Sequence, residues 1–216
     1  MSPAPKDCVI LVLLWRTNLK TVRDACELQS NALSIKLSDQ IEQLDQLITA
    51  EGDGTEFFGK TQITQGMQDL ISEGIARLAG ASSQAVFHLK QAMGGGKTHL
   101  LVGFGLLAKH PELRKVHCGG TLYGSAFGSA RTAAFNGRNN PDHFFWGEIA
   151  GQLGKGEQFR SFWTSGPKAP DEKDWLKLFD GGEPVLILFD ELPPYFHYLD
   201  TQKVGNGTVA DIATRA

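Results

Sequence analysis

A glycine-rich segment followed by a lysine and a threonine is the part of this sequence whose residue types and spacing could carry chemistry. It reads Gly94-Gly95-Gly96-Lys97-Thr98 and stands between a short apolar run and a helical pattern. Glycines let successive backbone N–H groups turn toward an anion, and the N-terminus of a helix favours negative charge. A lysine adds a mobile positive charge for the β- and γ-phosphates, and a threonine hydroxyl can ligate Mg²⁺. The segment therefore predicts a phosphate-binding loop for a nucleoside triphosphate.

The segment departs from the pattern G-x-x-x-x-G-K-[ST] at one position, the first, where Gln91 replaces glycine. We expect Gly94 and Gly95 to supply the unusual backbone dihedrals instead. The alternative is a chance match in an ordinary turn. No N-K-x-D motif for reading guanine occurs in the chain, so ATP is the expected nucleotide.

Two adjacent carboxylates, Asp190 and Glu191, form the second part of the predicted site. They follow the run VLILF (residues 185–189), which is apolar throughout, as expected of a strand covered on both faces. Doubly wound sheets bind their ligands at the carboxyl ends of such strands. Asp190 is expected to hold Mg²⁺, directly or through water, and Glu191 to orient the water that attacks the γ-phosphoryl group. An acidic turn after a strand is the alternative.

Alternating strand and helix patterns would position these residues. Short apolar runs predict strands at 85–89, 132–135 and 185–189, and 154–170 is expected to be loop. Apolar residues at helical spacing predict helices over 64–80, 97–109 and 146–153, around 175–179, and from 208 onward. The predicted fold class is α/β: a P-loop NTPase core with a mostly parallel sheet and flanking helices, incomplete at its C-terminus.

An N-terminal helical arm is expected to precede this core. Leucines, isoleucines and valines recur at helical spacing before residue 50, and EGDG (residues 51–54) breaks the pattern. We therefore expect residues 1–54 to form the arm and residues 55–216 to form the ATPase domain.

Composition excludes several classes of protein. A net charge of −3 argues against nucleic-acid binding driven by bulk charge. Three cysteines in widely separated positions predict reduced thiols rather than disulfides, and the histidines lack zinc-ligand spacing. The longest apolar run, residues 8–15, is too short to cross a bilayer. We expect a cytoplasmic protein that does not bind membranes.

Four segments resemble the N-terminal ATPase region of a large prokaryotic P-loop family. This family belongs to the broad AAA+ and STAND-like division and is similar to bacteriophage-exclusion ATPases. Its members are long ATPases of unknown function, often encoded beside DNA methyltransferases in anti-phage clusters. The segments are FFGKTQITQGMQDLISEGIARLAG (57–80), QAMGGGKTHLL (91–101), FNGRNN with WGEIAGQLG (within 135–154) and LILFDELPPYF (186–196).

This resemblance implies further site residues and partners. His99 completes the motif GGGKTH and joins the candidate nucleotide contacts, and Phe57 and Phe58 occupy the region that flanks adenine in related ATPases. Core packing of both phenylalanines is an equal alternative. By the resemblance alone, DNA or a DNA-modifying protein is a candidate partner, and a homo-oligomer of the full-length protein is an open option.

Three functions remain open at this point. The first is an ATP-dependent switch or motor that acts on DNA or on a protein in a defence or DNA-associated system. The second is a RecA-like helicase-type domain, because Asp190-Glu191-Leu192-Pro193 also reads as a DExx box. The third is a fragment that binds nucleotide without hydrolysing it. No further strands, polar sensor or arginine finger can be placed after Glu191, so we expect a truncated ATPase with slow or absent turnover.

Overall fold

The computed structural model describes residues 44, 54–90, 95–118, 125–139, 143–164 and 168–216. The chain divides into two units, residues 1–41 and 42–216, and all the described residues belong to the second. The predicted helical arm, residues 1–54, lies outside the described residues apart from positions 44 and 54.

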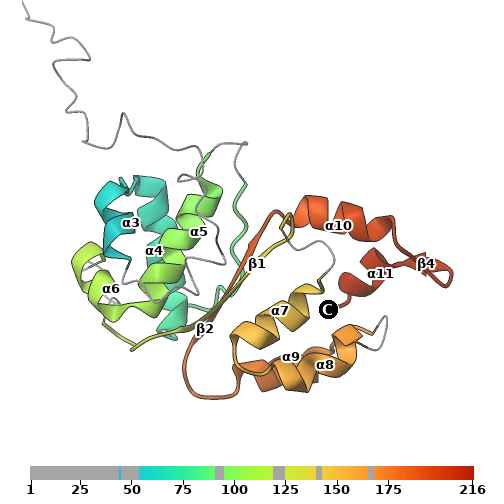
Figure 1. Cartoon of the computed structure of the whole chain (residues 1–216). Helices are drawn as coiled ribbons and strands as arrows, with labels where there is room; N and C mark the ends of the chain where they lie inside the picture. The colour runs from blue at the N-terminus through green and yellow to red at the C-terminus, as the bar shows by residue number, and fades with distance from the viewer. Residues whose placement is uncertain (1–43, 45–53, 91–94, 119–124, 140–142, 165–167) are drawn as a thin grey trace, which may run out of the picture. The chain divides into compact units, whose positions relative to one another are not determined.

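The described part of the chain has more helices than strands, and Figure 1 labels these helices. The elements are α3 (Thr55–Lys60), α4 (Gln65–Leu78), α5 (Lys97–Lys109), α6 (Pro111–His117), β1 (Arg131–Asn136), α7 (Phe145–Gln152), α8 (Gly156–Thr164), α9 (Glu172–Phe179), β2 (Val185–Asp190), α10 (Leu192–Asp200), β3 (Lys203–Val204), β4 (Gly207–Thr208) and α11 (Val209–Ala213).

The centre of this unit is a parallel pair of strands, β1 and β2, that carries helices on both faces (Figure 1). The register pairs Ala134 with Leu188 and Asn136 with Asp190. Because side chains alternate along a strand, Ala134 and Leu188 face one group of helices while their neighbours Ala133 and Ile187 face the other. Both faces carry helices, which explains why β2 is apolar up to its last residue, Asp190.

The first face packs against α5, and α3, α4 and α6 pack on α5 in turn. Helix α5 supplies much of the core on this face. Most residues of α5 are buried, and most of them are apolar for that reason. Gly74 of α4 lies so close to Phe104 of α5 that a Cβ at position 74 would stand 2.3 Å from the ring. Helix α5 is thereby enclosed between the sheet and the N-terminal helices.

The second face packs against α7 through α11. Trp146 and Ile149 of α7 are fully buried against β1, and Phe159 of α8 and Leu178 of α9 complete this core. Helix α9 begins with a capping box formed by Asp171 and Asp174, which satisfies N–H groups at the helix start.

Most of the elements expected from the sequence are present. Helix α5 spans Lys97–Lys109 as predicted, and Thr64 caps α4 by accepting a hydrogen bond from the Met67 N–H. Strands β1 and β2 contain the apolar runs predicted at 132–135 and 185–189. The β1–β2 pair is parallel, in agreement with the expected type of pairing.

Two predicted segments were wrong. Residues 85–89 form no strand: Val86 is 72% exposed, and no described strand pairs with the segment. A short apolar run does not specify a pairing partner, so periodicity alone misassigned it. The predicted loop 154–170 contains α8, because Phe159 and Phe162 lie one helical turn apart and both are buried.

Candidate phosphate-binding site

The first turn of α5 supplies the phosphate-binding part of the predicted site. Gly96 precedes the helix with φ 75° and ψ 22°, in the left-handed region that glycine adopts without steric cost. It offers no side chain to cap the helix, and the first N–H groups of any α-helix lack acceptors within the helix. Gly95 is exposed beside it, and Gly94 lies outside the described residues. The start of α5 thus has the backbone form that an anion site requires.

Thr98 and Asp190 meet although 92 residues separate them. The Thr98 hydroxyl donates a hydrogen bond of 2.5 Å to Oδ2 of Asp190. Asp190 is the last residue of β2 and is 8% exposed, and its side chain lies on the sheet face that packs against α5. The two halves of the predicted site therefore lie together at the carboxyl end of the sheet.

The chemistry of this pair suits a magnesium ion. A hydroxyl has one proton and two lone pairs, so Thr98 can donate to Asp190 and keep an oxygen lone pair for a cation. Mg²⁺ prefers oxygen ligands and is usually held by one or two carboxylates or hydroxyls together with phosphate and water. Threonine and aspartate side chains in contact fit that preference.

Glu191 has an unusual backbone conformation. Its φ of 53° and ψ of 37° lie in the left-handed region, and it is the one non-glycine residue with positive φ among those described. Its N–H donates to Oδ1 of Asp190 over 3.0 Å. Such a conformation costs about 1–3 kcal/mol and persists where the surroundings hold it in place. The turn places Glu191 between the end of β2 and the start of α10.

Gly137 packs directly against the turn at Glu191. Its N–H donates to the Asp190 carbonyl over 3.0 Å, and a Cβ on Gly137 would lie 2.6 Å from the Glu191 carbonyl oxygen. The same Cβ would lie 2.5 Å from Cβ of Tyr195. Only a residue without a side chain fits here. Asn136-Gly137 is a turn-forming pair directly after the strand predicted at 132–135, but nothing local indicates its approach to Glu191.

Tyr195 is buried beneath the same turn and does not line an open site. Its hydroxyl donates to the His143 carbonyl over 2.9 Å, and its ring contacts Phe135 of β1 edge to face. Burial raises the pKa of Tyr195 to about 12. The phenol is therefore neutral at physiological pH. Its buried contacts attach α10 to β1 and to His143.

The residues that the resemblance made candidate nucleotide contacts, His99 and the two phenylalanines, have partners in the protein. The His99 ring stacks on Phe57 with 4.4 Å between centroids, and its Nε2 lies 2.9 Å from the Thr61 hydroxyl. Phe58 stacks on His117 at the same centroid distance and is only 7% exposed. The packing alternative left open for Phe57 and Phe58 is thus what the structure describes, and an adenine contact remains a prediction.

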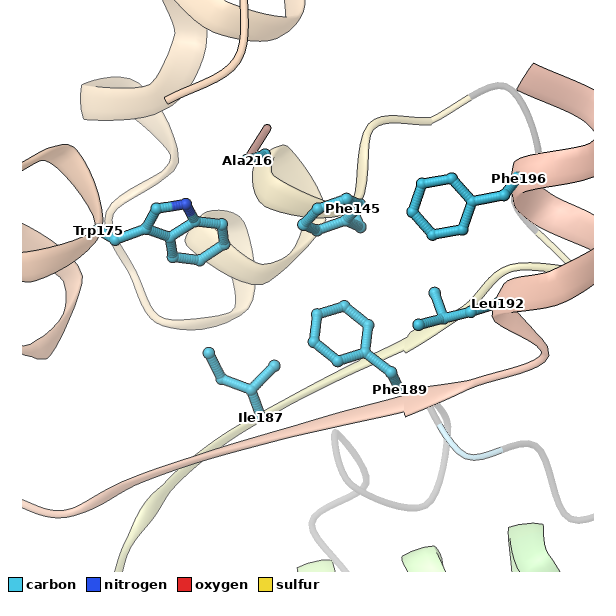
Figure 2. Close-up of a pocket in the computed structure, with 7 residues that line it drawn as sticks. All are labelled: Phe145, Trp175, Ile187, Phe189, Leu192, Phe196 and Ala216. Atoms are coloured by element: carbon cyan, nitrogen blue, oxygen red, sulfur yellow. The ribbon is translucent and has the colours of Figure 1, made fainter. Parts of the chain in front are cut away.

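A separate apolar cavity of about 340 Å³ lies on the opposite face of the sheet from Asp190. Figure 2 shows aromatic rings and aliphatic side chains directed into it from β2 and the surrounding helices. Phe189 and Leu192, on either side of the two acids, belong to its lining, which comprises Phe145, Trp175, Ile187, Phe189, Leu192, Phe196 and Ala216. Its lining includes no ionisable side chain, so it is distinct from the predicted phosphate site.

Among the residues that the structure describes, no three His, Cys, Asp or Glu side chains gather in a way that could hold a metal ion. The helices of the same residues include none that is long and apolar enough to cross a membrane.

One comparison with known proteins gives a match. A family model described as the DUF499 N-terminal domain matches residues 26–116, and this family is known from large ATPase-like proteins. The matched segment includes α3, α4 and α5 and ends before β1 and β2. No curated protein and no solved structure matches the chain significantly.

Proposed function

We propose that this chain binds Mg-ATP at the start of α5 and hydrolyses it slowly. The observation that carries the proposal is the 2.5 Å hydrogen bond between Thr98 and Asp190. It joins the residue after the lysine of a glycine-rich loop to a carboxylate at the end of a buried strand. Binding of magnesium together with phosphate needs both groups close to each other. An acidic turn unrelated to nucleotide binding need not contact Thr98.

Each residue has a separate role in this proposal. Backbone N–H groups from Gly95 and Gly96 onward receive the phosphate oxygens, and Lys97 neutralises the charge that builds up on the γ-phosphoryl group. Thr98 and Asp190 hold the magnesium ion, which when bound screens the phosphate charges. Glu191 orients the attacking water and accepts its proton. Catalysis by positioning and electrostatics requires little more from the protein.

The match to a family known from large ATPase-like proteins and the resemblance in four segments support an ATPase module of a prokaryotic defence or DNA-associated system. In that setting, the energy of ATP binding would drive a change in a DNA or protein partner. An arginine finger supplied by a partner or by a second subunit would raise the rate, by about 10³-fold or more.

Replacing Asp190 with asparagine tests the magnesium site. We expect Asp190→Asn to weaken Mg-ATP binding about tenfold, because the amide lacks the charge that attracts the cation. Binding of ATP in the presence of EDTA should change little. Isothermal titration with both forms of the nucleotide measures the difference.

The matched control for this variant is Asp180→Asn. Asp180 is an exposed carboxylate before the amino end of β2, at the far end of the strand from Asp190. Its replacement removes the same charge and should leave both affinities unchanged. Equal affinities for Mg-ATP in Asp190→Asn and the wild type would contradict the assignment of Asp190.

Replacing Glu191 with glutamine separates binding from hydrolysis. Glu191→Gln should keep the affinity for Mg-ATP and lower the rate of phosphate release on the order of 10²-fold, because glutamine cannot accept a proton from water. A sensitive phosphate assay in single-turnover conditions measures this rate. A variant that releases phosphate as fast as the wild type would remove Glu191 from the mechanism.

A further inference from the structure

Helix α3 is attached to the first turn of α5 by a small group of side chains. Thr61 ends α3, and His99 is the third residue of α5, directly after Lys97 and Thr98. The Thr61 hydroxyl lies 2.9 Å from Nε2 of His99, and the His99 ring stacks on Phe57 of α3. None of these three residues belongs to the predicted phosphate loop, but His99 directly follows its last residue, Thr98.

The direction of the hydrogen bond follows from the second contact of Thr61. Its hydroxyl donates to the Phe57 carbonyl over 2.7 Å, which uses its one proton. The oxygen must therefore accept from His99, so Nε2 carries a hydrogen. The bond fixes the tautomer and the orientation of the imidazole with respect to the end of α3.

Phe57 is held on α5 by two residues that lie one helical turn apart. Its ring stacks on His99 with an interplanar angle of 28°, and it approaches Gly103 so closely that a Cβ there would be 3.3 Å from Cε1. Residues i and i+4 share one face of a helix, so the phenylalanine occupies a groove between them. Phe57 is 5% exposed, and this packing leaves α3 little freedom to move relative to α5.

We propose that the Thr61–His99–Phe57 contact is a positioning device that holds the first turn of α5 in the orientation that phosphate binding requires. Gly96 provides no side-chain cap, so the first turn of α5 is held through its own side chains, by Thr98 on Asp190 and by His99 on α3. His99 is then a positioning residue rather than a contact to the nucleotide. The inference rests on the proposed function, because the affinity for Mg-ATP is its readout.

A second histidine–phenylalanine stack, between His117 and Phe58, offers a matched control. Phe58 stacks on His117 of α6 with the same 4.4 Å centroid distance and a similar interplanar angle of 23°. His117 lies at the C-terminal end of α6, which follows the far end of α5. Loss of either imidazole removes one histidine–phenylalanine stack, but only His99 is attached beside the phosphate loop.

The experiment compares the affinity for Mg-ATP in four variants of the chain by isothermal titration, with thermal unfolding as a second readout. We expect Thr61→Val, which is nearly isosteric and lacks the hydroxyl, to weaken binding about tenfold. His99→Ala should weaken it at least as much. Thr61→Ser should restore the wild-type affinity, and His117→Ala should keep it even where the melting temperature falls.

Three results in the variants would overturn the inference while the proposed function stands. If Thr61→Val and His99→Ala both bind with wild-type affinity, the contact does not position the loop. If only His99→Ala is impaired, the Thr61 hydrogen bond does not position the loop, and the three-residue contact is not the positioning device. If His117→Ala loses as much affinity as Thr61→Val, the effect is a general loss of stability. Absence of Mg-ATP binding in the wild type would instead overturn the proposed function, and the inference with it.

Discussion

Replacing Lys97 with alanine should reduce the affinity for Mg-ATP by about 10²- to 10³-fold, as measured by isothermal titration. Lys97 is the first residue of α5 and is half-buried beside the Thr98–Asp190 pair. A triphosphate carries several negative charges, and removing a partly desolvated cation that pairs with them costs about 2–5 kcal/mol. A tenfold change corresponds to about 1.4 kcal/mol, so the middle of this range corresponds to about 10²- to 10³-fold.

The control for this prediction is Lys109→Ala. Lys109 is the last residue of the same helix, so the variant loses the same charge from the opposite end of α5. Its affinity for Mg-ATP should stay within about twofold of the wild type at physiological ionic strength, because screening weakens charges farther than about 8 Å apart. Wild-type affinity in Lys97→Ala would refute the phosphate site as a whole.

Replacing Arg114 with methionine should destabilise the chain by about 3–5 kcal/mol without touching the site. Arg114 of α6 is fully buried, and its guanidinium donates to the carbonyls of Leu107 and Ala108 over 2.7 and 2.9 Å. It also donates to the carbonyls of Phe127 and Gly128. Methionine has a similar volume but no donor, so all four carbonyls would lose this partner.

The position of Arg114 explains the size of this effect. Leu107 and Ala108 are in the last turn of α5, where carbonyls lack partners within the helix and a positive charge is favourable. The guanidinium also lies 3.9 Å from the centre of the Phe127 ring. Burial lowers the pKa of Arg114, but an arginine stays protonated in proteins and keeps its donors.

Urea unfolding followed by circular dichroism measures the loss of stability. Arg160→Met is the control: Arg160 is exposed, and its pair with Glu157 is 3.3 Å long and on the surface. That change should alter the free energy of unfolding by no more than about 0.5 kcal/mol. Unfolding of both variants at the same urea concentration would show that the buried hydrogen bonds of Arg114 contribute no net stability.

Local features of the sequence were enough to predict several elements. The glycines before Lys97, the apolar spacing of residues 97–109 and the break at His110-Pro111 define α5 with both of its ends. Thr64 is an N-cap residue by type and is one in the structure. In these cases, the information lies within a few residues, because caps and helical spacing act over one or two turns of chain.

Features that depend on distant partners escaped prediction. The run at 85–89 is as apolar as a strand, but a strand needs a neighbour to pair with, and its own residues do not encode one. Arg114 has no sequence signal at all, because its acceptors are carbonyl groups that every residue has. The need for glycine at position 137 arises from Glu191 and Tyr195, which are more than 50 residues away.

The candidate site likewise combines features that the sequence predicts with features that only the tertiary structure determines. By itself, the sequence determined which groups could act on a triphosphate: backbone amides of a glycine-rich loop, an ammonium group, a hydroxyl and two carboxylates. Only the tertiary structure decided that Thr98 and Asp190 touch, that Glu191 adopts a left-handed conformation and that His99 faces α3. The reason is physical: residue types fix the available chemistry, whereas the packing of α5 against β2 fixes the distances between groups that are far apart along the chain.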